Sequence, residues 1–330
     1  MSISDPEALT ALDRKLRLVD DRVAAVVHGY QTGLYLYGAG GMGKSYGVLG
    51  TLRNLSADFR LFNSRMTGKG LFRALERAPA AVHVLEDMER LTGDRDGQGV
   101  LRAALWAQPG REREVTWTTG DGESRFSFGG GIIMLANRPL NDLPELRALA
   151  TRIAVHRLEI SDPEMTAQLR RIAQGGFTRT GFANPDQVEF NAEGGFVEKG
   201  PTLESPICSE ICQYVINECK DANCPLDLRL YDNSCLDYLQ WQAGDTHCHW
   251  HDLVSTRVRQ CAAHFRHQVD HMGIEERKQQ QRQIVREICS QIDDPQERLR
   301  RWQDVTGASK NTFYRRKAEF ESGEFEVAIP

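Results

Sequence analysis

The chain has 330 residues, enough for two or three domains, and a hydrophobic fraction of 40% that can supply a folded core. We find no apolar run long enough to cross a membrane and no signal-peptide pattern, so we expect a cytoplasmic protein without a membrane partner. The net charge of −5 excludes a uniformly basic coat for nucleic acid, but residues 252–320 carry 14 Lys and Arg against 10 Asp and Glu, which makes this region locally basic.

The first predicted elements are a helix, a strand and a glycine-rich loop. Apolar residues recur at helical spacing over residues 5–28, and the start signal Asp5-Pro6 predicts Asp5 as the N-cap and Pro6 in the first turn. Residues 34–37 then have the pattern of a short buried strand, and a helix is predicted after residue 45. A strand, a glycine loop and a helix in this order form the context of a phosphate-binding P-loop.

The glycine loop has the complete P-loop spacing, with Gly38 followed after four residues by Gly43-Lys44-Ser45. Backbone N–H groups of glycines can curl around phosphate oxygens, and the following helix points its positive end at the same anion. Lys44 would reach the β- and γ-phosphates of ATP, and the Ser45 hydroxyl would ligate Mg²⁺. An ordinary glycine-rich turn is the alternative. The residues expected to bind the nucleotide are Gly38, Gly40, Gly41, Met42, Gly43, Lys44, Ser45 and Tyr46.

Two acidic residues follow a strand that is apolar on both faces. Strands are predicted at 59–62 and 81–85, and the second ends in Glu86-Asp87. Such a pair is similar to a Walker B motif, in which one acid holds Mg²⁺ and the other polarises the attacking water. By position Glu86 is the metal-side residue and Asp87 the base. Their order is the reverse of the usual one, and a solvated acidic strand end is the alternative reading.

The next stretch alternates helices and strands up to residue 155. Helices are predicted over 68–78 and 100–107, and alternating residues around a Gly/Asp turn predict a β-hairpin over 115–128. A strand at 132–136 ends at Asn137, whose side chain could bond the attacking water or the γ-phosphate. A helix over 144–151 leads to a fifth strand at 151–155.

This order of parts resembles the AAA+ ATPases over roughly residues 15–250. The resemblance implies an α/β fold in which a parallel P-loop sheet, flanked by helices, occupies residues 1–160. A helical lid is expected at 161–250, with an irregular insertion at 175–206, and a small all-α domain at the C-terminus.

The resemblance also implies roles for polar residues outside the P-loop. Asn137 matches the sensor 1 position, and Arg229 in Asp227-Leu228-Arg229-Leu230 matches sensor 2. Arg152 fits the arginine finger, which acts on ATP bound by the neighbouring subunit, and Arg147 is the alternate. A surface salt bridge is the other reading of Arg152. The expected catalytic residues are Glu86, Asp87, Asn137, Arg152 and Arg229, with Ser45 and Glu86 at the metal.

The C-terminal part is predicted to bind DNA. Residues 251–294 have the composition of a basic helical linker, and residues 321–330 form an acidic tail. Between them, residues 295–320 are similar to a helix-turn-helix, whose second helix enters the major groove. Asn311 and Thr312 would lie near base edges, and Lys310, Arg315 and Arg316 near phosphates. A small helical hairpin that binds protein or only packs is the alternative.

Two further residues are candidates for DNA contact within the core. In one branch of the AAA+ family a hairpin at this place lines a central pore, where Arg125 would face the strand. Lys69, in the predicted loop 66–70, would contact phosphate in the same way. Simple solvation is the alternative for both side chains.

All eight cysteines lie after residue 207, and a cytosolic setting disfavours disulfides between them. Their spacing, and that of the His/Cys run 247–251, matches no usual zinc pattern, so free thiols are favoured over zinc ligands.

The sequence therefore predicts an ATP-hydrolysing AAA+ oligomer, a hexameric ring or a helical filament, that acts on DNA. Helicase, helicase loader, replication initiator and regulator of transposition or recombination fall within this class, with a possible protein partner in replication or recombination. An AAA+ remodeller or signalling regulator of a protein partner is the alternative, and the reversed Glu86-Asp87 order leaves open a scaffold that barely hydrolyses ATP.

Overall fold

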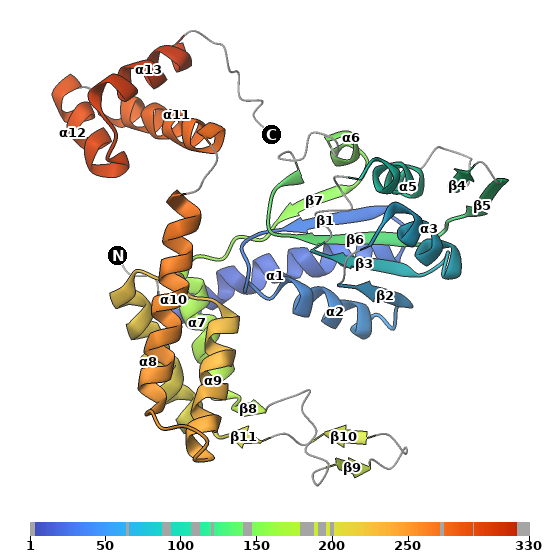
Figure 1. Cartoon of the computed structure of the whole chain (residues 1–330), viewed down its shortest axis with the longest axis horizontal. Helices are drawn as coiled ribbons and strands as arrows, with labels where there is room; N and C mark the ends of the chain where they lie inside the picture. Colours follow the sequence, from blue (N-terminus) through green and yellow to red (C-terminus); the bar gives the residue numbers. More distant parts are fainter. Residues whose placement is uncertain are drawn as a thin grey trace. The chain divides into compact units, whose positions relative to one another are not determined.

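In the computed structural model, the described residues are 4–63, 66–87, 94–106, 113–119, 122–140, 147–178, 188–190, 196–198, 201–270, 274–292 and 294–321. The chain divides into two compact units, Met1–Arg259 and Gln260–Pro330 (Figure 1). The predicted hairpin turn at 120–121, the helix start at 144–146 and most of the acidic tail, 322–330, lie outside the described residues.

The first unit is built on a five-stranded parallel sheet in the order β2-β3-β6-β1-β7. The central strands β1 (Gly33–Tyr37), β3 (Val82–Glu86) and β6 (Gly131–Ala136) are buried along nearly their whole length, whereas β2 (Phe59–Phe62) and β7 (Ala154–Arg157) form the edges. Strands that are buried on both faces need a continuous run of apolar residues, and such runs predicted the three central strands. The predicted parallel α/β sheet is confirmed.

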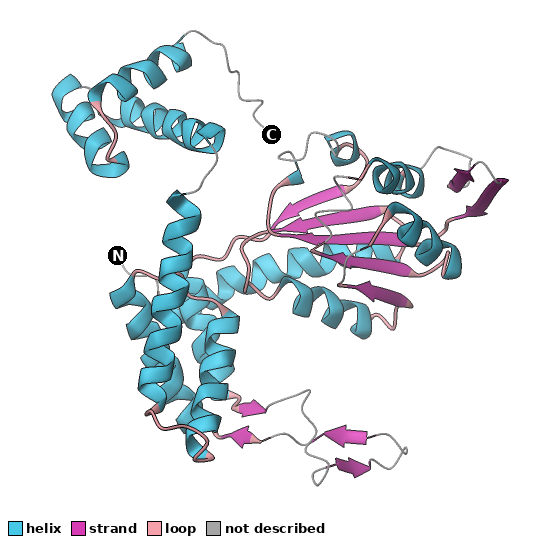
Figure 2. Cartoon of the chain, in the orientation of Figure 1, coloured by secondary structure: helices cyan, strands magenta, loops and turns pink. Residues whose placement is uncertain are grey.

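Helices cover both faces of this sheet (Figure 2). α1 (Asp5–Val27) and α2 (Lys44–Asn54) lie on one face, and α3 (Gly68–Arg77) and α5 (Arg95–Leu105) on the other (Figure 1). Because successive strand residues point to opposite faces, Leu34 and Leu36 pack into the core beside α1 and α2, and Tyr35 into the core beside α3 and α5.

Two element starts differ from the prediction. The N-cap of α1 is Ser4 rather than Asp5, because the backbone N–H and the hydroxyl of Ser4 both donate to the Glu7 carboxylate. β7 begins at Ala154 rather than at 151, because the short helix α6 (Arg147–Ala150) closes with a turn in which the Arg152 N–H donates to the Leu149 carbonyl oxygen.

The predicted β-hairpin forms from β4 (Glu114–Thr119) and β5 (Gly122–Ser127), with Thr119 opposite Gly122. Aromatic side chains fix it to α3. The Phe72 ring centroid lies 5.9 Å from that of Trp117 and 5.2 Å from that of Phe126.

The helices α7 (Asp162–Gln174), α8 (Ser205–Ala222) and α9 (Leu228–Gln242) fall within the range predicted for the lid and are called the lid, and α10 (Trp250–Asp270) follows. Within 175–206, β8 (Phe177–Thr178) pairs with β11 (Thr202–Leu203), and β9 (Val188–Phe190) with β10 (Phe196–Glu198). The cysteines are free thiols, and within the described ranges no group of three His, Cys, Asp or Glu residues is placed to hold a metal ion.

Three ion pairs join α1 to α7. They are Asp5–Arg170 at 2.8 Å, Asp13–Arg171 at 2.8 Å and Lys15–Glu164 at 2.7 Å. Since α1 also packs against α2 and the sheet, the lid and the core form parts of one unit.

The second unit contains α11 (Ile274–Gln291), α12 (Pro295–Thr306) and α13 (Lys310–Glu321). Its core consists of Val285, Ile288, Trp302 and Phe313. The predicted linker 251–294 is therefore wrong for α11, which supplies two of these core side chains. Over the described part of the chain, we find no helix with the length and apolar character to cross a membrane.

Candidate functional site

The glycine loop connects the carboxyl end of β1 to the first residue of α2. Gly41 and Gly43 have φ angles of 73° and 79°, a region that glycine enters without steric cost. The start of α9 lies directly against this loop, because the Leu228 N–H donates to the Gly41 carbonyl oxygen at 3.0 Å. A Cβ added at Gly41 would lie only 2.5 Å from Cβ of Asp227. Two positions of the loop thus require glycine.

Lys44 is held inside the loop. Its Nζ donates to the carbonyl oxygens of Gly38 at 2.8 Å and Ala39 at 2.7 Å, and to Oδ1 of Asn137 at 3.2 Å. Burial lowers the pKa of Lys44, and the nearby Arg229 guanidinium lowers it further, while Asp87 opposes the shift. The carbonyl oxygens keep the ammonium group at the place where phosphate oxygens would meet it.

The two acids at the end of β3 occupy different environments. Glu86 is half-buried, and its Oε1 has no hydrogen-bond partner among the described residues. Asp87 is exposed, has a φ of 50°, and accepts from Nδ2 of Asn137 at 3.5 Å. A non-glycine residue in the left-handed region is a strained feature that occurs preferentially at functional sites.

Oxygen ligands are the kind that Mg²⁺ prefers, and the structure offers two at this place. The Ser45 hydroxyl and the Glu86 carboxylate both line the same pocket. Because a buried carboxylate oxygen without a partner is costly, the orphaned Oε1 of Glu86 fits a role as a direct or water-mediated ligand. The residues present are therefore compatible with Mg²⁺.

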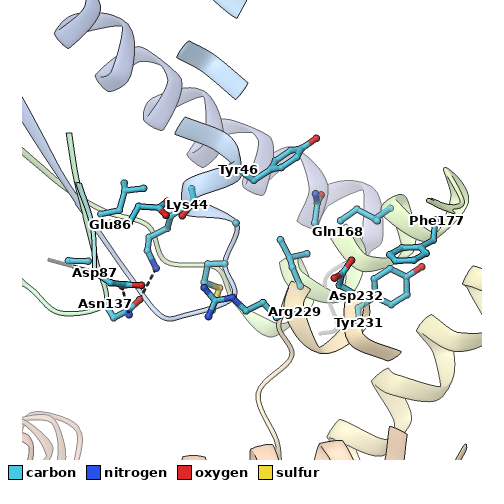
Figure 3. Close-up of a pocket in the computed structure, with 18 residues that line it drawn as sticks. Lys44, Tyr46, Glu86, Asp87, Asn137, Gln168, Phe177, Arg229, Tyr231 and Asp232 are labelled. Atoms are coloured by element: carbon cyan, nitrogen blue, oxygen red, sulfur yellow. Dashed lines mark hydrogen bonds between the residues drawn. The ribbon is translucent and has the colours of Figure 1, made fainter. Parts of the chain in front are cut away.

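The pocket has a volume of about 650 Å³ and receives residues from the loop, the ends of β3 and β6, and the lid. Lys44, Asp87 and Asn137 lie on one side of it (Figure 3). Gln168, Phe177, Tyr231 and Asp232 gather on the other side, and Arg229 lies between the two groups.

The lid side of this pocket was missed by sequence reasoning. The unpredicted lining residues are Gln168, Ile172, Phe177, Tyr231 and Asp232. A signal existed for Asp232, which lies three residues after Arg229 and so on the same face of α9. No local signal existed for Phe177, which reaches the pocket through the pairing of β8 with the distant β11.

No protein-family model matches the sequence. An uncharacterised 36.7 kDa protein of Enterobacteria phage T4 is 24% identical over 164 residues, which cover 43% of this chain and 50% of that protein. The match therefore spans about half the length of the curated relative.

Similar solved structures include a point mutant of Thermotoga maritima RuvB, with a TM-score of 0.38, 13% identity and 66% of each chain covered. The Thermotoga maritima RuvB Holliday junction branch migration motor has a TM-score of 0.35 and 14% identity, and 67% of this chain and 66% of that one are covered. A DNA replication initiation factor has a TM-score of 0.38 and 10% identity over 91% of this chain and 81% of its own.

The molecule combines five parallel strands with a P-loop after the first, acids after the third, an asparagine after the fourth in chain order, and a helical lid on the P-loop. The chain has the P-loop α/β fold that the AAA+ resemblance predicts. Arg229, the residue predicted for sensor 2, lies in the first turn of α9 and lines the pocket. Its Nη1 lies 3.9 Å from a Cβ built on Gly40.

Arg152 lies at the other end of the parallel sheet. It precedes β7, which runs parallel to β1, so it is placed at the amino ends of the strands, whereas the P-loop follows their carboxyl ends. Its guanidinium carbon lies 5.2 Å from the ring centroid of Trp106. The structure therefore separates Arg152 from the P-loop of its own chain. The alternate, Arg147, begins α6, and its side chain lies outside the described part of the chain.

The candidate DNA contacts in the core are both exposed. Lys69 lies in the first turn of α3 rather than in the predicted loop, since Thr67 caps that helix by accepting from the Gly70 N–H. Arg125 lies on β5, 66% exposed, with Nη1 3.7 Å from Oε1 of Glu114.

In the second unit, Lys310, Asn311 and Arg315 are exposed on α13, and Thr312 is half-buried. Arg316 does not fit the predicted phosphate contact. It is buried, and it donates to the Glu319 carboxylate and to Oε1 of Gln281 at 3.0 Å. Its role is therefore to join α13 to α11.

Proposed function

We propose that the chain binds and hydrolyses a nucleoside triphosphate, with ATP expected from the AAA+ resemblance, and that it acts on DNA as an oligomer. The observation that carries the proposal is the hydrogen-bonded set of Lys44, Asn137 and Asp87, which faces a pocket that Arg229 also enters. These residues come from distant parts of the sequence and supply the groups that phosphoryl transfer needs.

Each residue of this set has a distinct task in the proposed reaction. Lys44 would exchange its carbonyl partners for phosphate oxygens. Asp87 would accept the proton of the attacking water, and Asn137 would hold that carboxylate in place. Mg²⁺, held by Ser45 and Glu86, would supply positive charge to the phosphates when bound.

Oligomerisation is part of the proposal because of where Arg152 lies. A guanidinium at the amino ends of the strands cannot serve the P-loop at their carboxyl ends, so it would act on the nucleotide of a neighbouring copy. A ring or a filament would meet this condition.

Action on DNA is supported by the exposed basic residues of the second unit. Lys310 and Arg315 lie on α13, and Arg300 and Arg301 are exposed on α12. Unlike Arg316, these side chains are open to solvent and can approach phosphates.

The first experiment measures ATP binding and phosphate release by the full chain and by Lys44→Ala. We expect the variant to lose both, while the control Lys220→Ala, on the exposed surface of α8, keeps them. Undiminished turnover of Lys44→Ala would refute the site. Arg152→Ala should bind ATP without turnover, and mixing it with Lys44→Ala should restore part of the activity. A mixture as inactive as its components would refute the shared site.

A second experiment measures turnover and gel mobility with single-stranded and duplex DNA at low salt, where phosphate contacts are strongest. We expect DNA to raise turnover and to shift the protein in the gel. If both stay unchanged, action on DNA is excluded and a protein substrate becomes the better explanation.

A further inference from the structure

The side of the pocket opposite Lys44 has the character of a slot for a flat ring. Ile172, Phe177 and Tyr231 supply apolar surface, and Gln168 and Asp232 supply polar groups (Figure 3). The Tyr231 hydroxyl is turned into the lid core, where it donates to the Cys208 carbonyl oxygen at 3.4 Å, and burial raises the pKa of this phenol. Tyr231 therefore presents its ring, and not its hydroxyl, to the slot.

The orientation of the Gln168 amide is fixed by its neighbours. Nε and Nη2 of Arg171 donate to Oε1 of Gln168 at 3.0 and 2.5 Å. Nη1 of Arg171 donates in turn to both carboxylate oxygens of Asp13 at 2.8 and 3.1 Å. Because a guanidinium has donors only, the amide oxygen must face Arg171. The amide NH₂ is then the group that Gln168 can offer to a ligand.

Asp232 supplies the complementary group. Its carboxylate lines the same pocket and can only accept hydrogen bonds when it is ionised. The slot thus combines aromatic and aliphatic surface with one fixed donor and one acceptor.

We propose that this side of the pocket is a base subsite for an aminopurine, in which Asp232 accepts from the exocyclic amino group and Gln168 donates to a neighbouring acceptor of the base. Adenine offers its N6 amino group beside ring nitrogen acceptors, and guanine offers an amino group and O6. In uracil the donor N–H lies between two carbonyl oxygens, which a carboxylate repels. A pyrimidine also has less surface for stacking on Phe177 and Tyr231.

This inference rests on the proposed nucleotide binding, so the experiment includes a ligand that has no base. Calorimetry with the full chain would measure binding of tripolyphosphate and of two matched pairs, ATP with purine riboside triphosphate and GTP with inosine triphosphate. Each pair differs by the amino group alone. In the pair whose base fits the slot, we expect the compound without the amino group to bind about tenfold more weakly than its partner, because it lacks the hydrogen bond to the charged Asp232 carboxylate.

Variants distinguish binding of the base from binding of the phosphates. Asp232→Ala should bind both members of each pair equally, and Gln168→Glu, which replaces the donor by a carboxylate, should weaken ATP about tenfold. Neither should change tripolyphosphate binding, whereas Lys44→Ala should lose it. The exposed Asp221→Ala on α8 is the control. Retained tripolyphosphate binding by Lys44→Ala would refute the P-loop site instead.

Three outcomes would overturn the base subsite. The first is equal loss of ATP and tripolyphosphate in Gln168→Glu or Asp232→Ala. The second is equal affinity for both members of each pair in the unchanged protein. The third is a preference for ATP over 2′-deoxy-ATP that Asp232→Ala abolishes, which would place Asp232 at the ribose.

Arg171 is a positioning residue in this scheme, and Arg170 provides its matched control. Both arginines pair with an aspartate of α1 and are about equally exposed, at 39% and 41%, but only Arg171 contacts Gln168. We expect Arg171→Leu to weaken ATP about fivefold relative to tripolyphosphate, since the amide is freed to rotate, and Arg170→Leu to leave that ratio unchanged. The same ratio in both variants would refute the positioning role.

Discussion

Gly41→Ala tests the contact between the P-loop and the lid. An alanine at a φ of 73° costs about 1–2 kcal/mol relative to glycine. Its Cβ would lie 2.5 Å from Cβ of Asp227, which is attached to the backbone and cannot rotate away. Relief requires the loop and the lid to separate, and this breaks the 3.0 Å bond between the Leu228 N–H and the Gly41 oxygen, worth about 1 kcal/mol. We expect a loss of about 2–3 kcal/mol in the free energy of unfolding.

The assay is urea unfolding of the full chain, followed by tryptophan fluorescence and circular dichroism. Gly47→Ala is the control, because Gly47 is helical and an added Cβ would meet nothing within 4 Å. It should be neutral or stabilising by up to about 1 kcal/mol.

A double variant isolates the cause of the effect. Asp227→Gly removes the obstructing Cβ and, as an N-cap glycine, costs only a few tenths of a kcal/mol. In the Asp227→Gly background, Gly41→Ala should lower the free energy of unfolding by less than it does in the unchanged protein, because the clash with the Asp227 Cβ is gone. Equal costs in the two backgrounds, or a Gly41→Ala variant as stable as Gly47→Ala, would refute the reasoning.

Other predictions concern the site, the core and the second unit. Asn137→Ala should lower turnover at least tenfold, since the Asp87 carboxylate loses its hydrogen-bond donor, but leave ATP affinity within about threefold, since Lys44 keeps two carbonyl partners. Steady-state kinetics measures the turnover and calorimetry the affinity. Unchanged turnover would contradict the prediction. Burial lowers the pKa of His83, whose Nε2 donates to the Ala78 oxygen, so the unfolded chain takes up a proton first as the pH falls below 6.5. Stability should then fall by at most about 1.4 kcal/mol per pH unit, and His83→Gln should flatten this part of the urea-unfolding profile. Arg315→Ala should weaken DNA binding and reduce its salt dependence, whereas Arg316→Ala should mainly lower the melting temperature of the second unit; the reverse pattern would contradict the assignment of these two side chains.

Most of the core was predictable because its signals are local. Continuous apolar runs located the central strands, and the P-loop spacing located Lys44 within the pocket. Asn137 and the acids were predictable because residues that follow parallel strands meet at one edge of the sheet.

The features that could not be predicted from the sequence depend on tertiary contacts. The lid side of the pocket combines residues of α7, β8 and α9, which no sequence spacing links. Arg316 is a basic residue in a basic helix, which is the sequence pattern of a DNA contact. The packing of α13 on α11 buries its side chain against Gln281. The role of α11 was hidden by its polar composition, since two apolar side chains, Val285 and Ile288, suffice to place it in a small core.

The three ion pairs between α1 and α7 make the lid sensitive to ionic strength. Most of their side chains are 35–45% exposed, so added salt screens them, while the apolar contacts of the same helices are unaffected. Because α7 carries Gln168 and Arg171, rising salt should loosen the base side of the pocket and speed nucleotide exchange. Salt also weakens contacts to DNA phosphates, so a change in ionic strength would act on both proposed ligands, nucleotide and DNA, in the same direction.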